Sequence, residues 1–168
     1  QAEGDAKGLQ GGYDPTAALQ SAWLSSAAYC SASHLQTWSC GQPCDSVKVT
    51  GTAAVTFDSA LDLQAYVVEL SSGAPFVVFR GTEPSSLKNW ILNLNISRPV
   101  PYDGCTGCSV EGGFYHGYQE LMPNLLSSLG QLGYGPGDDV HVTGHSLGAS
   151  MATVAAYELA AAGWNVQS

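Results

Sequence analysis

Hydrophobic residues along this chain fall into short runs and periodic stretches that predict strands alternating with helices. Segments 47–57 and 61–70 are expected to be strands, and the short segment 58–60 between them suits the turn of a β-hairpin. Two shorter apolar runs, 76–80 and 140–143, are typical of buried strands. The pattern therefore predicts a central sheet whose later strands are buried.

Helices are expected at three places between these runs. Residues 15–29 begin with Pro15, which fits the first turn of a helix, and follow Asp14, whose carboxylate suits an N-cap. Residues 115–132 place four leucines on one helical face, and residues 149–159 form an alanine-rich helical stretch. Strands and helices thus alternate as in an α/β fold.

Three further segments complete the pattern. Residues 97–113 contain two prolines and two cysteines and are expected to be a loop, whereas 163–166 reads as the approach to another parallel strand. Residues 87–94 predict a short amphipathic helix, because apolar side chains recur at helical spacing. These side chains are Leu87, Trp90, Ile91 and Leu94. Periodicity alone favours a surface helix packed on the core over a mobile lid.

Composition limits the classes of function. A chain of 168 residues with 45% hydrophobic content can bury one sizeable core, so one domain is expected, spanning 1–168. Its net charge of -9 argues against nucleic-acid binding and against electrostatic docking on anionic lipid. No apolar run reaches the roughly 18 residues of a membrane-spanning helix. Gln1 is expected to be the processed N-terminus of an extracellular protein.

A Gly-His-Ser-Leu-Gly motif occupies 144–148, between the predicted strand 140–143 and the predicted helix 149–159. The bare Gly-x-Ser-x-Gly pattern is weak evidence, because glycine and serine are frequent in this chain. Between a strand and a helix it fits a nucleophile elbow, since glycines permit a sharp turn and a helix N-terminus offers free N–H groups. Ser146 is therefore predicted to be a nucleophile; the alternative is a glycine-rich turn before an ordinary helix.

A second segment fits the same chemistry. The strand 76–80 ends at Gly81 and Thr82, where a hydrolase of this kind would place half of an oxyanion hole. We expect the backbone N–H of Leu147 to be one donor and that of Thr82 to be the other, with the Thr82 hydroxyl as a further candidate. A plain turn after the strand is the alternative.

The chain has five cysteines, an odd number. Cys40 and Cys44, and likewise Cys105 and Cys108, are close enough in sequence to form local disulfides, which leaves Cys30 with an external partner or as a free thiol. Zinc binding by the four is disfavoured by the sixty residues between the pairs. A redox role for Cys105 and Cys108 is disfavoured because they occupy a loop and not a helix N-terminus. We therefore expect no metal and no other cofactor.

A serine nucleophile needs a base and a carboxylate that orients it. All four histidines precede Ser146, whereas this fold uses the order Ser, Asp, His. The side chain of His145 is expected to pack or hydrogen-bond and to point away from the Ser146 hydroxyl. His141 is expected to be buried on a strand and His34 to lie in an exposed polar loop. For His116, loop or core packing is favoured over an approach to the cleft. Glu158, the only later carboxylate, is too far along its helix to serve.

These motifs, in this order, resemble those of the secreted fungal class 3 lipases, a family that includes feruloyl esterases and phospholipases. The likeness covers most of the chain, and its matching segments are 27–30, 78–82, 89–91, 105–108, 113–114 and 143–149. The resemblance implies an α/β-hydrolase fold, of which this chain carries the N-terminal part of a central, mostly parallel sheet.

The resemblance also implies roles for particular residues. Ser146 would be the nucleophile, Thr82 and Leu147 the oxyanion hole, and 87–94 a lid. It implies that the triad Asp and His lie in loops that this chain does not contain, and that Cys30 bonds a cysteine beyond residue 168. We therefore hypothesise that a second polypeptide from the same precursor, linked through Cys30, completes the sheet and supplies both residues.

The sequence thus predicts a secreted carboxylic ester hydrolase that acts on lipid esters through an acyl-enzyme. The alternatives are a feruloyl esterase or phospholipase of the same family, or a non-catalytic module that binds lipids or other esters. Trp90 and Ile91 favour long acyl chains, and contact with a lipid surface would be hydrophobic. Asn95 begins an Asn-Ile-Ser glycosylation sequon directly after the predicted lid.

Overall fold

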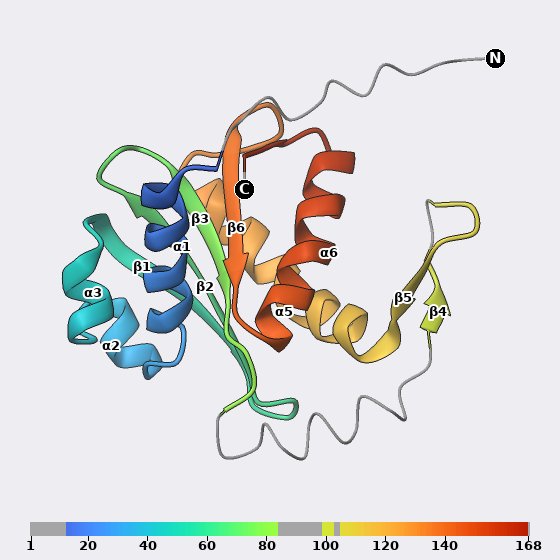
Figure 1. Ribbon diagram of the computed structural model, residues 1–168, viewed down its shortest axis with the longest axis horizontal. Helices are drawn as coiled ribbons and strands as arrows, with labels where there is room; N and C mark the ends of the chain where they lie inside the picture. Colours follow the sequence, from blue (N-terminus) through green and yellow to red (C-terminus); the bar gives the residue numbers. More distant parts are fainter. Residues whose placement is uncertain (1–12, 84–98, 103–104, 168) are drawn as a thin grey trace.

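A five-stranded sheet covered by helices on both faces organises the chain (Figure 1). The computed structural model describes residues 13–83, 99–102 and 105–167. The strands, in spatial order, are β1 (Val49–Asp58), β2 (Leu63–Leu70), β3 (Pro75–Phe79), β6 (Asp139–Gly144) and β7 (Asn165–Val166). β2 pairs antiparallel with β1 and β3, whereas β6 pairs parallel with β3 and β7. The predicted hairpin and the predicted parallel strand after 163 are therefore confirmed.

Helices flank this sheet in two groups. One face carries α1 (Pro15–Ala27), α2 (Ala32–Gln36) and α3 (Gln42–Ser46), and the other carries α5 (Gly112–Gln131) and α6 (Leu147–Ala161) (Figure 1). Asp14 caps α1 as predicted, because its carboxylate accepts the backbone N–H groups of Thr16 at 2.8 Å and Ala17 at 3.3 Å.

Side chains of β2 and β3 alternate between two hydrophobic cores. Those that pack with α5 and α6 are Ala65, Val67, Val77 and Phe79. Those that pack with α1 and α2 are Tyr66, Val68, Phe76 and Val78. Successive residues of a strand point to opposite faces, so a strand covered on both faces reads as a continuous apolar run.

The expectation that 97–113 is a loop is wrong for much of that segment. β4 (Pro99–Pro101) and β5 (Ser109–Glu111) form a separate antiparallel hairpin. Prolines are tolerated there because each strand of a two-stranded hairpin has one unpaired edge. α5 begins three residues earlier than predicted, since the Glu111 carboxylate accepts the N–H of Phe114 at 2.8 Å and caps the helix.

Candidate active site

Ser146 sits on the sharp turn between β6 and α6. β6 ends at Gly144 and α6 begins at Leu147, so a single turn reverses the chain direction. The backbone of Ser146 has φ 58° and ψ -126°, a left-handed conformation that residues other than glycine seldom adopt. Such strain costs on the order of 1–3 kcal/mol and persists only where the surrounding structure enforces it. The predicted strand, elbow and helix are therefore present.

The two glycines of the motif are required by close backbone contacts. A Cβ on Gly144 would overlap the carbonyl group of Gly148 and lie 2.9 Å from the nitrogen of Ala149. A Cβ on Gly148 would overlap the Phe79 carbonyl oxygen and lie 2.8 Å from its carbon. The first turn of α6 thus packs directly on the end of β3, which brings the two predicted donor segments together.

Gly81 and Thr82 follow β3 and lie against the elbow. A Cβ built on Gly81 would be 3.2 Å from the Cβ of Ser146 and would overlap the His145 carbonyl oxygen. The Thr82 hydroxyl oxygen is buried and has no hydrogen-bond partner within the described part of the chain. A buried hydroxyl without a partner costs free energy of folding. Its position beside the elbow therefore fits a hydrogen-bond donor to an anion formed during the reaction.

Leu147 occupies the first position of α6. The next two N–H groups already have acceptors, because Gly148 donates to the His145 carbonyl at 3.0 Å and Ala149 to the Ser146 carbonyl at 2.9 Å. The N–H of a first helical residue has no carbonyl four positions back within its helix. Leu147 therefore presents this group at the positive end of the helix dipole, next to Ser146.

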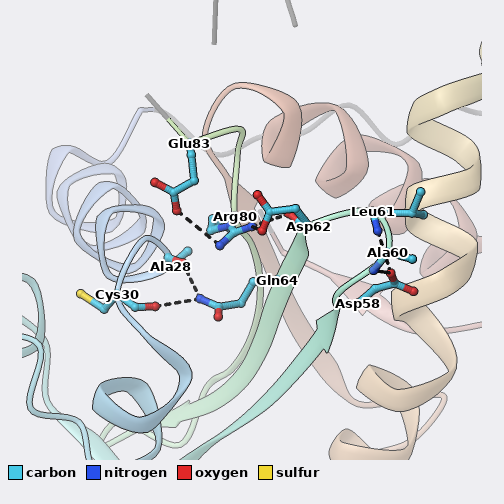
Figure 2. Close-up of polar contacts among 9 residues, drawn as sticks. All are labelled: Ala28, Cys30, Asp58, Ala60, Leu61, Asp62, Gln64, Arg80 and Glu83. Atoms are coloured by element: carbon cyan, nitrogen blue, oxygen red, sulfur yellow. Dashed lines mark hydrogen bonds and ion pairs between the residues drawn. The ribbon is translucent and has the colours of Figure 1, made fainter. Parts of the chain in front are cut away.

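Arg80, the residue after β3, lies between the side chains of Asp62 and Glu83 (Figure 2). Only 8% of Arg80 is exposed, and its guanidinium contacts the Asp62 carboxylate at 2.7 Å and the Glu83 carboxylate at 3.3 Å. The backbone carbonyl of Asp62 accepts from the same guanidinium. Sequence reasoning treated Arg80 only as the end of a strand. The sequence did contain a signal for this role, because Arg80 ends a buried apolar run and a buried arginine requires carboxylate partners.

The histidines occupy four different environments. His145 Nδ1 forms a hydrogen bond with the Tyr29 hydroxyl at 2.8 Å, in keeping with its predicted hydrogen-bonding role. His141 stacks on Phe76 with 4.5 Å between ring centroids, and burial lowers its pKa while Asp139 opposes the shift. His34 is exposed as expected, although it lies on α2 and not in a loop.

The expected position of His116 is wrong. It lies on α5 rather than in a loop or in the core, and it faces solvent 3.8 Å from Glu120. The Nδ1 atoms of His145 and His34 contact the Tyr29 and Ser31 hydroxyls, and that of His116 lies near Glu120. Glu158 is engaged elsewhere, as it accepts the Tyr102 hydroxyl of the β4–β5 hairpin. The described residues thus hold the candidate nucleophile and the candidate oxyanion donors, while the contacts given for His34, His116, His145 and Glu158 are with other groups.

An open groove of about 590 Å³ runs beside the elbow, between α1 and the end of β6. The lining residues from α1 and the turn after it are Ala18, Ser21, Ala22, Ser25, Ser26 and Tyr29, and those from the other side are Thr143, Gly144 and His145. Ser25 and Thr143 bridge its floor through their hydroxyls at 3.1 Å. The side chains are small and mostly uncharged, so the groove suits the packing of protein or an apolar group.

Two disulfides are present, one between Cys40 and Cys44 and one between Cys105 and Cys108. Cys30 is not disulfide-bonded to any residue in the described ranges; its sulfur is half-buried, 3.8 Å from the Cys40 carbonyl, and burial raises the pKa of the thiol. The predicted lid residues Leu87, Trp90, Ile91 and Leu94, and the sequon residue Asn95, lie outside the described residues.

The described residues contain neither a candidate metal site nor a candidate membrane-spanning helix. No group of three or more His, Cys, Asp or Glu side chains there could hold a metal ion. None of the helices described is both long enough and apolar enough to cross a membrane.

Comparisons with known proteins agree with this geometry. A family model described as lipase (class 3) matches residues 76–168. The secreted mono- and diacylglycerol lipase A of Penicillium cyclopium is 31% identical over 127 residues, which are 72% of this chain and 40% of that protein. The chain thus spans less than half the length of this curated relative.

Solved structures extend the similarity to most of the described fold. A triacylglycerol lipase whose catalytic centre is formed by a serine protease triad matches with a TM-score of 0.70 at 29% identity, covering 90% of this chain and 58% of that one. The triacylglyceride lipase of Rhizomucor miehei matches with a TM-score of 0.69 at 27% identity, covering 92% and 61%.

Proposed function

This chain belongs to the class 3 lipase family, and we propose that it forms the nucleophile-bearing part of a secreted carboxylic ester hydrolase that acts on lipid esters. The observation that carries the proposal is the left-handed backbone of Ser146 at the strand–helix turn, with the Thr82 hydroxyl nearby, buried and without a hydrogen-bond partner among the described residues. The names of the relatives, which are mono- and diacylglycerol or triacylglycerol lipases, support lipid esters as the substrate class.

The proposed reaction is acyl transfer through a covalent intermediate. The Ser146 hydroxyl oxygen bonds to the acyl carbon while a base takes its proton, and the carbonyl electron pair moves onto oxygen. This oxyanion is stabilised by the N–H groups of Leu147 and Thr82, together with the Thr82 hydroxyl. Collapse of the intermediate expels the alcohol, which takes the proton from the base. Water then cleaves the acyl-enzyme by the same steps and releases the acid.

The base and its orienting carboxylate are proposed to lie in polypeptide outside residues 1–168. A histidine and an aspartate would approach Ser146 from the side of the groove between α1 and β6, which is open and lined by small residues. We propose that Cys30 forms a disulfide with that polypeptide, since it is the one cysteine left after the two local disulfides. Residues 1–168 would then be the N-terminal portion of one α/β-hydrolase domain.

Substrate entry is proposed to involve the amphipathic segment 87–94. Its apolar positions would cover the acyl site and favour long acyl chains, as long as the segment moves aside at a lipid surface. Cinnamoyl esters and phospholipids are the competing substrates within the family. Activity on emulsified triacylglycerol measured beside methyl ferulate and phosphatidylcholine would rank the three.

The decisive experiment is labelling with a fluorophosphonate probe followed by intact mass, non-reduced and reduced. We expect Ser146 to carry the adduct, Ser146→Ala to abolish it and Ser150→Ala, a serine on the same helix, to leave it unchanged. A labelled species that splits on reduction into this chain and a second one supports the linkage through Cys30. Labelling without splitting overturns that linkage alone, whereas absence of labelling supports a non-catalytic binding module.

A further inference from the structure

Tyr29 is held in place by a buried side chain from the central sheet. Gln64 on β2 is only 3% exposed, and its amide nitrogen donates to the carbonyl oxygens of Ala28 and Cys30, both at 2.8 Å (Figure 2). These two residues flank Tyr29 in the sequence. The backbone that carries the Tyr29 ring is therefore fixed relative to β2, and through β2 to β3.

The Tyr29 hydroxyl touches both segments of the candidate active site. It is 2.8 Å from His145 Nδ1, and the two rings meet edge to face with 6.0 Å between centroids. It also lies so close to Gly81 that a Cβ on that residue would overlap it. Burial and the charge of Glu83 raise the pKa of Tyr29, while the nearby Gly81 backbone and the charge of Arg80 oppose the shift.

One hydroxyl can serve both contacts at once. A neutral tyrosine oxygen accepts a hydrogen bond while its proton is donated to another group. With the Gly81 N–H as donor to this oxygen, the hydroxyl proton is directed at Nδ1 of His145, which then carries its own proton on Nε2. Each of the three groups is satisfied in this arrangement.

Among the described residues, the backbone pairing of β3 with β6 stops short of this place. The parallel pairing of β3 with β6 ends at Phe79 and Gly144. The segments that carry Thr82 and Ser146 begin just after these two residues. Oxyanion donors must stand about 2.7–3.1 Å from the developing charge, so the separation of these segments is critical. The Tyr29 hydroxyl links the residue before Thr82 to the residue before Ser146.

We propose that Tyr29 is a positioning residue for acyl transfer: its hydroxyl bridges Gly81 and His145 and sets the distance between the Thr82 donor and the Ser146 nucleophile. This inference rests on the proposed function. It also accounts for glycine at 81, since any side chain there would displace the bridging hydroxyl. Tyr29 touches no reacting atom in this scheme, so its removal should slow the chemical step without weakening ester binding.

The test is Tyr29→Phe, introduced into the form of the protein that reacts with the fluorophosphonate probe. The variant is assayed with p-nitrophenyl butyrate and with that probe. We expect kcat and the labelling rate to fall roughly tenfold, with KM changed by less than about twofold. Tyr134→Phe is the matched control, because the Tyr134 hydroxyl also makes a hydrogen bond to a residue distant in sequence, the Gly73 carbonyl at 3.1 Å, without contacting the elbow. Thermal unfolding of both variants verifies that they are folded.

A double-mutant cycle with His145→Ala provides a second, independent measurement. If the bridge acts as a unit, the double variant loses no more activity than the more impaired single variant. Two outcomes, both with a wild-type protein that reacts with the probe, would overturn the inference and leave the proposed function intact. One is additive losses in the double variant, and the other is a Tyr29→Phe variant that labels as fast as wild type. Failure of the wild-type protein to label would overturn the proposed function, and this inference with it.

Discussion

Gly148 packs on the carbonyl group of Phe79, so closely that a Cβ on the glycine would lie 2.8 Å from the carbonyl carbon. This contact joins the first turn of the nucleophile helix to the end of the strand that leads to Thr82. The geometry of the candidate site thus depends on a helix and a strand that meet without intervening side chains.

Gly148→Ala is therefore expected to destabilise the protein by about 1–3 kcal/mol, because the backbone of either β3 or α6 must shift to admit a methyl group. Urea unfolding would measure the change in the free energy of unfolding. The matched control is Gly130→Ala on α5, where a Cβ meets open space and should stabilise the helix by about 0.5–1 kcal/mol. Equal stabilities for the two variants would contradict the contact.

Thr82→Val separates catalysis from stability. Removal of a hydroxyl that donates to the oxyanion should lower kcat roughly 100- to 1,000-fold. The free energy of unfolding should stay constant or rise, because the same hydroxyl is buried without a partner among the described residues. Thr153→Val, which removes a hydroxyl bonded to the Ala149 carbonyl at 2.9 Å, is the control and should retain full kcat. Wild-type turnover by Thr82→Val would exclude the hydroxyl as a donor.

Asp62→Asn tests the anchor of Arg80. Asparagine tolerates the left-handed backbone of this position, where φ is 52°, so the substitution removes charge with little added strain. We expect a loss of about 1 kcal/mol, because the buried guanidinium loses its closest carboxylate while the exposed position of Asp62 weakens the interaction. Glu83→Gln, at 3.3 Å from the guanidinium, should cost less. A larger loss for Glu83→Gln would assign the anchoring role to Glu83 instead.

His141 should make stability depend on pH. Burial against Phe76 lowers its pKa from the ordinary 6.5, so the unfolded chain binds more protons just below that pH. The free energy of unfolding should therefore fall as pH decreases through 6.5 toward the folded pKa, and this contribution should be constant above 7. His141→Asn should show a shallower dependence in chemical denaturation between pH 7 and 5. An unchanged slope would show that other groups account for the pH response.

Much of the fold could be predicted from local patterns. Asp14 and Pro15 predict the start of α1, and the apolar run of β3 is explained by burial on both faces of the sheet. The β4–β5 hairpin was missed because its prolines argue against strands, and the early start of α5 was missed because its cap is a glutamate followed by two glycines. Both failures arise from local features, a glutamate cap three residues before Phe114 and a proline-containing hairpin, that residue propensities alone do not indicate.

By itself, the sequence determined the strand-turn-helix setting of Ser146, and it predicted the candidate nucleophile and the two candidate donor segments, because these follow from short motifs whose spacing is read along one stretch of chain. Only the tertiary structure decided which distant residues support them: Asp62 with Arg80, Gln64 with the turn that carries Tyr29, and Tyr29 with His145. The physical reason is that these pairs are 18 to 116 positions apart, so their contacts depend on strand order and helix packing.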